Sequence, residues 1–493
     1  MVEHSDTDAY RRTSGGTAAA ASATMSPGRL GNSIEAESGT GAGIELARYG
    51  LKSASSDDGG SRDGDEDDGQ LLSPLVGSLN IEKDALLTAV GAPHVDDGHG
   101  ALPPGSANTT QLVINIVISF VGAGLLGIPY AMQKSGWLLG SICLLIVSGL
   151  NLYAMLLLPQ VQKILVQRGF ENCNTYGDLG RCIMGPAGEI LVNVCLCVSQ
   201  VGFATAYIIF IAANLYSIAQ FPRGIVCLVC IPGLCILVQF RELKHLSPFS
   251  LLANCSNFAA LSAVLFQDLE TYQPHNDAIH AVKWDGFLYI IAVTLYSIEG
   301  VGMVLSLEAS CKDRSSFPKV LAIVCSCIAL FMSFFGSAGY LAFGDQTMAP
   351  ITLNLAGHWS STFVKCALCL GLYLTYPIMM FPVWATTETF VPRMKTEATM
   401  RVPFRCCLVI ASTFVAYSFP HFGEFLGLVG SSICTILGLI LPCYFSLSVQ
   451  RDVSPYWKIC LNLFLMIGGA IFGIKGTYNS LTAMMNGEPV GEG

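Results

Sequence analysis

The run Gly122-Ala-Gly-Leu-Leu-Gly-Ile-Pro129 interrupts an apolar segment that extends from Ile114 to Ala131. A second run, Ser297-Ile-Glu-Gly-Val-Gly302, interrupts the apolar segment from Phe287 to Ala309 in the same way. A helix that crosses a bilayer must satisfy its backbone polar groups internally, so unwinding is tolerated only where the helix is buried in protein or lines a cavity. Two such interruptions, one in each half of a membrane domain, predict the binding site of a transporter.

The composition is that of a polytopic membrane protein, because 52% of the 493 residues are hydrophobic and only 12% are charged. Apolar runs repeatedly reach the roughly 20 residues that a membrane-spanning helix needs. They predict eleven spans, near residues 111–133, 136–158, 189–218, 222–240, 246–266, 286–309, 318–343, 361–391, 404–419, 423–448 and 458–484. We therefore expect an all-α membrane domain over residues 109–485 and a short non-cytosolic tail, 486–493.

Residues 1–108 form a separate acidic segment, which holds 17 of the 35 acidic residues and 7 of the 26 basic ones. The segment is rich in Gly, Ser, Ala and Asp and has no helical or strand period, so we expect it to be disordered. Within it, Asp67, Leu71 and Leu72 form an acidic dileucine pattern that a sorting adaptor would bind. A chance match is the alternative, since short motifs of this kind recur in such tails.

Basic residues predict the orientation of the domain in the membrane. If the N-terminus is cytosolic, the inner loops hold 14 Lys and Arg residues and the outer loops hold four, which is the bias expected of cytosolic loops. The predicted outer loops carry no cysteine and no Asn-x-Ser/Thr acceptor. This pattern favours a vacuolar or lysosomal membrane, with the plasma membrane as the alternative.

The interruptions supply backbone groups that suit a zwitterion. Freed amides at the start of a half-helix attract an anion such as a carboxylate, and exposed carbonyls at the end of the opposing half-helix attract an ammonium group. Close packing between helices is the alternative explanation for Gly-x-Gly at residues 122–124. Glu299, in the second interruption, has two explanations: a site that binds and releases a proton, and a structural carboxylate paired with backbone amides.

Four stretches carry a resemblance to a known family: Phe120-Val-Gly-Ala-Gly-Leu-Leu-Gly-Ile-Pro-Tyr-Ala131, Ser297-Ile-Glu-Gly-Val-Gly-Met303 with Leu307-Glu308, Phe317-Pro-Lys319, and Gly339-Tyr-Leu-Ala-Phe-Gly-Asp345. They resemble the amino acid/auxin permease family of the APC superfamily, and within it the plant vacuolar and the animal proton-assisted amino acid transporters. The resemblance implies a LeuT-like fold with a five-plus-five inverted repeat, broken helices 1 and 6, and an added eleventh helix. It also implies a small neutral amino acid as substrate, moved with protons.

The resemblance extends to individual positions. Gly122, Ala123, Gly124 and Leu126 match the unwound first helix, which holds the substrate carboxylate in the family. The positions that match the unwound sixth helix, on the amino-group side, are Ser297, Glu299 and Gly300, with Tyr296 directly before them. Tyr207 and Tyr376, together with Tyr373 and Thr375, offer aromatic and hydroxyl groups for the wall of a small-solute pocket, although contacts between helices use the same residue types.

Together with the interruptions, the resemblance implies secondary active transport of small neutral amino acids by alternating access, coupled to protons. Its partners would be the amino acid, protons, the lipid bilayer and an adaptor on the tail. Sodium coupling is a second option, because carbonyls at the interruptions can ligate that ion. The alternative function is an amino acid sensor that signals through its tail with little flux. The sequence has no Ser/His/Asp set, metal-ligand cluster or nucleotide loop, so we expect no enzyme activity, cofactor, metal or nucleic-acid partner.

Overall fold

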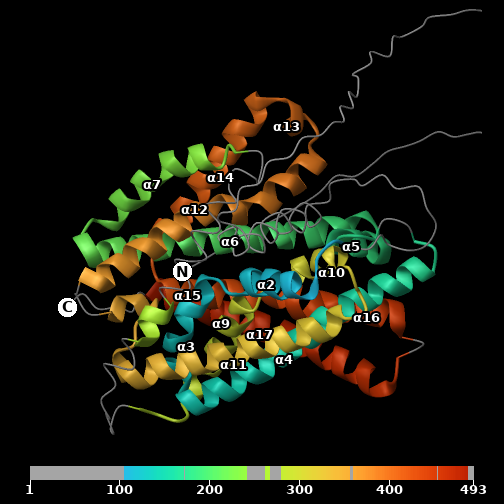
Figure 1. Ribbon diagram of the computed structural model, residues 1–493, viewed down its shortest axis with the longest axis horizontal. Helices are drawn as coiled ribbons and strands as arrows, with labels where there is room; N and C mark the ends of the chain where they lie inside the picture. Colours follow the sequence, from blue (N-terminus) through green and yellow to red (C-terminus); the bar gives the residue numbers. More distant parts are fainter. Residues whose placement is uncertain are drawn as a thin grey trace, which may run out of the picture. The chain divides into compact units, whose positions relative to one another are not determined.

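The regular structure of this chain is helical (Figure 1). A computed structural model describes residues 105–170, 173–240, 261–266, 279–355, 359–451 and 454–486. The helices of the N-terminal half are α2 (Thr109–Phe120), α3 (Ile128–Ser135), α4 (Trp137–Gln167), α5 (Tyr176–Met184), α6 (Pro186–Ala219) and α7 (Arg223–Leu237). Those of the C-terminal half are α9 (Phe287–Ser297), α10 (Val304–Ser310), α11 (Phe317–Phe343), α12 (Trp359–Phe390), α13 (Arg393–Thr396), α14 (Ala398–Ser418), α15 (Phe422–Val429), α16 (Leu441–Gln450) and α17 (Tyr456–Asn486). Short 3-10 segments are η1 (Ala123–Gly127), η2 (Trp284–Gly286), η3 (Val301–Met303), η4 (Gly344–Gln346) and η5 (Ile351–Asn354), and π-helical segments are η6 (Gly430–Cys434) and η7 (Ile436–Ile440).

The described helices confirm a multi-pass membrane domain. Within the described ranges, eight helical segments are long and apolar enough to cross a bilayer, and the bent pair of α2 and α3 makes a ninth. Helix α7 is apolar but only 15 residues long, and of the expected span at 246–266 only residues 261–266 are described. The count of eleven spans therefore stays a prediction. The acidic tail and its dileucine pattern lie outside the described residues.

Helices at corresponding positions of the two halves contact each other, alongside further contacts such as that of α3 with α11. Helix α3 contacts α9, α4 contacts α11, α6 contacts α12, and α7 contacts α14. Figure 1 shows α4 and α11 running side by side, with α6, α7, α12 and α14 gathered in a second group. Pairing of successive helices in this order is what an inverted repeat related by a two-fold axis requires.

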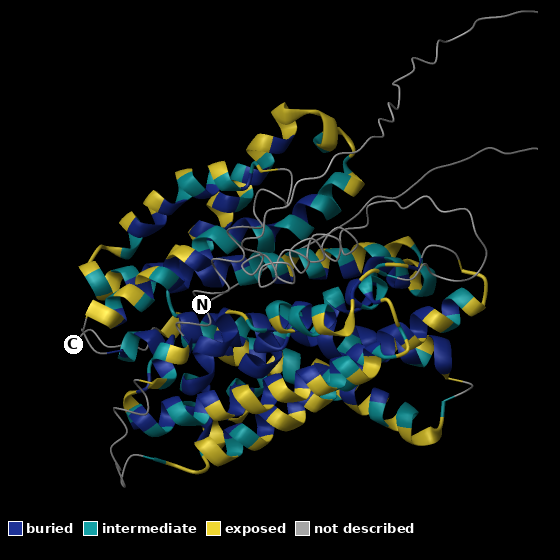
Figure 2. Cartoon of the chain, in the orientation of Figure 1, coloured by how far each residue is buried: buried dark blue, intermediate teal, exposed yellow. Residues whose placement is uncertain are grey.

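Burial distinguishes central from peripheral helices. In the most apolar 18-residue stretch of each segment, 78% of the residues are buried in Trp284–Ser310, which contains α9 and α10, and 72% in Phe422–Gln450, but only 22% in α17. Figure 2 shows the buried residues concentrated on α9 and α15. Large apolar side chains on α7 and α17, such as Val229 and Ile474, are exposed, as expected for helices that face lipid hydrocarbon.

Candidate functional site: two interrupted helices in contact

The first interruption is present at the predicted position. Helix α2 ends at Phe120, and both Val121 (φ −92°, ψ 91°) and Gly122 (φ −118°, ψ −169°) are extended. The chain then re-enters a helical path through η1 and α3. The two half-helices are bent by 47° relative to each other, so this span is broken as the sequence predicts.

The second interruption is present as well. Helix α9 ends at Ser297, and both Ile298 (φ −112°, ψ 23°) and Gly300 (φ −158°, ψ 7°) leave the helical conformation before η3 begins. The first half-helix is 12 residues long in α2 and 11 residues long in α9. In both halves the break thus follows a half-helix of similar length, and the two predicted broken helices are confirmed.

The two breaks touch each other. A β-carbon placed on Gly124 would lie 2.8 Å from the Ser297 hydroxyl oxygen, 2.9 Å from the Tyr296 ring and 3.0 Å from the Ser297 α-carbon. A β-carbon on Gly300 would overlap the ring of Phe120, the last residue of α2. Glycine is needed at both positions because each break closes directly onto the other.

The first break leaves backbone amides open. The first hydrogen bond of η1 runs from the Leu125 amide to the Gly122 carbonyl oxygen at 3.3 Å, so the amides of Ala123 and Gly124 precede the helical ladder. Gly122 is exposed, and a β-carbon there would meet nothing within 4 Å. Open amides beside open space form an anion-binding arrangement, since the start of a helix carries positive partial charge.

In the second break, the backbone amides are bonded by a side chain of the break itself. The Glu299 carboxyl accepts hydrogen bonds from the backbone amides of Gly300 and Val301, so this side chain covers the start of the second half-helix. Its Oε2 atom is shielded from solvent and has no hydrogen-bond partner among the described residues. The structural explanation of Glu299 is thus present in the geometry, and one carboxyl oxygen remains available for a proton.

Asn151, a polar residue that the sequence analysis missed, binds the backbone of the second break. The Asn151 side-chain amide, on α4, donates to the Ile298 carbonyl oxygen at 2.9 Å. Asn115, on α2, is also buried, and neither polar atom of its side chain has a partner within the described part of the chain. An amide side chain inside an apolar run is a signal for such residues, because it is costly in a membrane unless it serves a bond or a ligand.

Aromatic side chains surround the end of α9. The Tyr296 ring meets Phe203 of α6 edge to face, with centroids 4.9 Å apart, and Tyr207 of the same helix lies within electrostatic range of the Tyr296 phenol. Ser297 is buried, and its hydroxyl has no hydrogen-bond partner among the described residues. The structure therefore brings Tyr207, Tyr296 and Ser297 together with the breaks.

Three other predicted residues of the site are engaged elsewhere. The hydroxyl of Tyr376 lies 2.7 Å from that of Ser412 on α14, and Tyr373 donates to the Cys230 carbonyl of α7 at 3.2 Å. Thr375 donates to the carbonyl of Gly371, one turn earlier in its own helix. Among the described residues, no hydrogen bond or ring contact joins these three side chains to the breaks. Leu126 is buried within η1.

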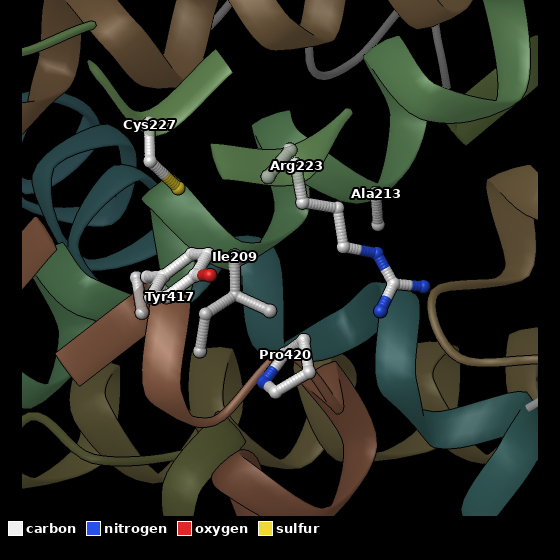
Figure 3. Close-up of a pocket in the computed structure, with 8 residues that line it drawn as sticks. Ile209, Ala213, Arg223, Cys227, Tyr417 and Pro420 are labelled. Atoms are coloured by element: carbon white, nitrogen blue, oxygen red, sulfur yellow. The ribbon is translucent and has the colours of Figure 1, made fainter. Parts of the chain in front are cut away.

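One small pocket lies apart from the breaks (Figure 3). It is formed where the end of α6 meets the start of α7 and the end of α14. Its labelled lining residues are Ile209, Ala213, Arg223, Cys227, Tyr417 and Pro420. None of the predicted substrate-binding residues lines it, so it supplies no support for the site at the breaks.

The arrangement defines a class: a membrane carrier with two interrupted helices in a LeuT-like fold. The helices superpose on a manganese transporter mutant of Eremococcus coleocola with a TM-score of 0.51 and 13% identity, over 81% of this chain and 92% of that one. They also superpose on Mhp1 in its inward-facing conformation, with a TM-score of 0.51 and 10% identity over 81% of this chain and 96% of that one. At these identities the likeness concerns the fold.

The family is established by sequence. Residues 105–482 match the family described as transmembrane amino acid transporter protein, and the chain belongs to that family. It is 36% identical to the amino acid transporter AVT3B of Arabidopsis thaliana over 385 residues, which cover 75% of this chain and 92% of the relative. It is 34% identical to ANT1 of the same plant over 398 residues (76% and 92% covered). The proton-coupled amino acid transporter-like protein pathetic of Drosophila melanogaster is 24% identical over 422 residues (79% and 88%). The predicted family and the predicted absence of enzyme activity are confirmed by these relatives.

Proposed function

We propose that the protein moves small neutral amino acids across a membrane by alternating access and that protons drive the movement. The observation that carries this proposal is the asymmetry of the two breaks. One break leaves amides open beside an unfilled space at Gly122, whereas the other has its amides bonded by Glu299.

The open amides of Ala123 and Gly124 bind the substrate carboxylate. They start a helical path of 13 residues, Ala123–Ser135, whose positive end faces the anion. The Gly122 position, which has no neighbour within 4 Å of a β-carbon, leaves room for the carboxylate to reach the backbone.

The end of α9 binds the amino group. Carbonyl groups in the last turn of a helix carry negative partial charge and lack partners within the helix. The unpaired hydroxyl of Ser297 adds an acceptor beside them. Tyr296, Phe203 and Tyr207 then form an apolar wall, which favours a small side chain without charge.

Glu299 couples the proton to the substrate. As a carboxylate it holds the amides of Gly300 and Val301 with charge-assisted hydrogen bonds, and a protonated carboxyl would hold them more weakly. Protonation at Oε2 therefore loosens the start of the second half-helix, next to the amino-group side of the site. This is the differential interaction that a proton needs in order to shift the balance between two conformations.

The location that we propose is the membrane of an acidic organelle, a vacuole or lysosome, with the N-terminus in the cytosol. The excess of basic residues in the expected inner loops supports this orientation. A fluorescent fusion expressed in plant or yeast cells tests it, and signal at the plasma membrane would argue against it.

The test of function is uptake of labelled amino acids by proteoliposomes with and without an imposed pH gradient. We expect uptake of small neutral amino acids to rise with the gradient in the parent protein and to lose this dependence in Glu299→Gln. Glu189→Gln, which neutralises a carboxylate in the first turn of α6, is the matched control and should behave as the parent. Binding without flux would identify a sensor instead, and equal uptake with and without the gradient would refute proton coupling.

A further inference from the structure

Two cysteine side chains, one just before the short helix α5 and one in its last turn, meet outside the membrane-spanning helices. The sulfur of Cys173 lies 2.9 Å from the sulfur of Cys182. Cys173 precedes the capping box that begins α5, in which Thr175 and Asp178 bond each other's backbone amides, and Cys182 lies in the last turn of the helix. A disulfide has an S–S length of about 2.05 Å, so a small movement of the side chains would join the segment before α5 to the last turn of that helix.

The two thiols differ in their access to solvent. Cys173 is buried, whereas Cys182 is partly exposed. Burial, followed by the hydrogen bond with Cys182, raises the pKa of the Cys173 thiol to about 12. Cys182 is therefore the thiol that meets an oxidant in solution.

We propose that Cys173 and Cys182 form an oxidation site at which a peroxide converts the two thiols into a disulfide that slows transport. The Cys182 sulfur attacks one oxygen of hydrogen peroxide, giving a sulfenic acid and water. The Cys173 sulfur then attacks the Cys182 sulfur, the S–O bond breaks, and the hydroxyl leaves with the Cys173 proton as a second water. The two sulfurs lose two electrons in all, and the peroxide gains them.

The environment of the pair connects it to the breaks. The Cys173 carbonyl accepts a hydrogen bond from the Gln162 side chain of α4 at 2.7 Å, which holds the start of α5 against that helix. Three residues further on, the fully buried Tyr176 donates to the Leu437 carbonyl in η7 at 2.9 Å. The Tyr176 phenol also lies within electrostatic range of Glu299.

A bond between Cys173 and Cys182 would therefore fix the segment that positions Tyr176. If α5 must shift when η7 and the second break rearrange, the disulfide holds the described conformation and lowers the rate of transport. With the N-terminus in the cytosol, α5 lies on the cytosolic side, where disulfides are characteristically transient and redox-sensing. This effect on rate rests on the proposed transport function, whereas formation of the bond does not.

The first measurement concerns the bond alone. The purified full-length protein is treated with hydrogen peroxide, free thiols are alkylated, and the peptide that contains both cysteines is analysed by mass spectrometry. We expect an unalkylated peptide lighter by two hydrogen atoms, which a dithiol reductant returns to the doubly alkylated form. Full alkylation of both residues after peroxide would overturn the proposal, whatever the protein transports.

The second measurement concerns the rate. Uptake by proteoliposomes should fall several-fold after peroxide treatment and recover with the reductant. Cys182→Ser should retain its uptake after peroxide, and Cys173→Ser provides a second variant in case the first folds poorly. Cys460→Ser removes an exposed cysteine on α17 and should stay as sensitive as the parent. Equal loss of uptake in the parent and in both serine variants at α5 would refute the assigned site.

Discussion

The contact between the two breaks predicts a large effect of one methyl group. In Gly124→Ala the new β-carbon would lie 2.8 Å from the Ser297 hydroxyl oxygen, 2.9 Å from the Tyr296 ring and 3.0 Å from the Ser297 α-carbon. Comfortable separations between carbon atoms are about 3.5–4.0 Å. The hydroxyl can rotate away, but the Tyr296 ring is held by Phe203 and the α-carbon belongs to the backbone. The half-helix η1 must therefore move away from α9 by about half an ångström or more.

Overpacking of this kind destabilises a core by about 1–3 kcal/mol. If the strain falls on the conformation that binds substrate, the apparent affinity drops about 5- to 150-fold. We expect Gly124→Ala to raise the KM for uptake by an amount in this range, or to lower the thermal unfolding midpoint in detergent if the strain falls on the whole fold.

Gly149→Ala is the matched control. Gly149 is an exposed residue of α4, and a β-carbon there would meet nothing within 4 Å. The substitution also favours the helix by roughly 0.5–1 kcal/mol, so uptake and unfolding midpoint should equal or slightly exceed those of the parent. If Gly124→Ala matches Gly149→Ala in both KM and unfolding midpoint, the two breaks are not in direct contact and the reasoning is wrong.

Two further predictions concern stability. Asn151→Leu removes the donor to the buried Ile298 carbonyl and should destabilise the protein by about 1–3 kcal/mol. Asn115→Leu makes the same chemical change where no hydrogen bond is lost, so it should be neutral or stabilising. Unfolding midpoints in detergent compare the two variants, and equal effects would contradict the role of Asn151. Burial, with the nearby Arg223 as a second cause, lowers the pKa of His421 below its usual value of about 6.5. The unfolded chain then binds this proton at a higher pH than the folded protein, so the contribution of His421 is present above about pH 6.5 and is lost as the pH falls. His421→Gln should weaken the decline of the unfolding midpoint between about pH 7 and pH 5, and an unchanged decline would assign the acid sensitivity to other groups.

The position of the breaks could be read from the chain because the signals are local. Glycines at 122, 124 and 127 and Pro129 lie within one apolar run, and Glu299 lies within another. A run of this composition cannot complete its helical hydrogen bonds alone, whatever the rest of the chain does. The same local patterns predict the lengths of α2 and α9 before the breaks, and they also carry the resemblance to the family.

The lining of the site could not be read in the same way. Tyr296 and Tyr376 are equally plausible on sequence, yet the structure packs the first against Phe203 beside the breaks and bonds the hydroxyl of the second to Ser412 on α14. Asn151 reaches a carbonyl 147 residues away in the chain, a distance that no local pattern encodes. The two explanations of Glu299 were also left open by the sequence, and the amides of Gly300 and Val301 lie within its reach only once the backbone turns out of the helix.

The sequence by itself determined that this is a multi-pass carrier of the amino acid transporter family with two interrupted helices, since hydropathy, glycine content and charge act over a few residues at a time. Only the tertiary structure decided that Gly124 closes on Ser297, that Gly300 closes on Phe120, and that one break keeps its amides open while Glu299 takes those of the other. These are consequences of how distant helices pack, and packing depends on shapes that are complementary only after the chain has folded.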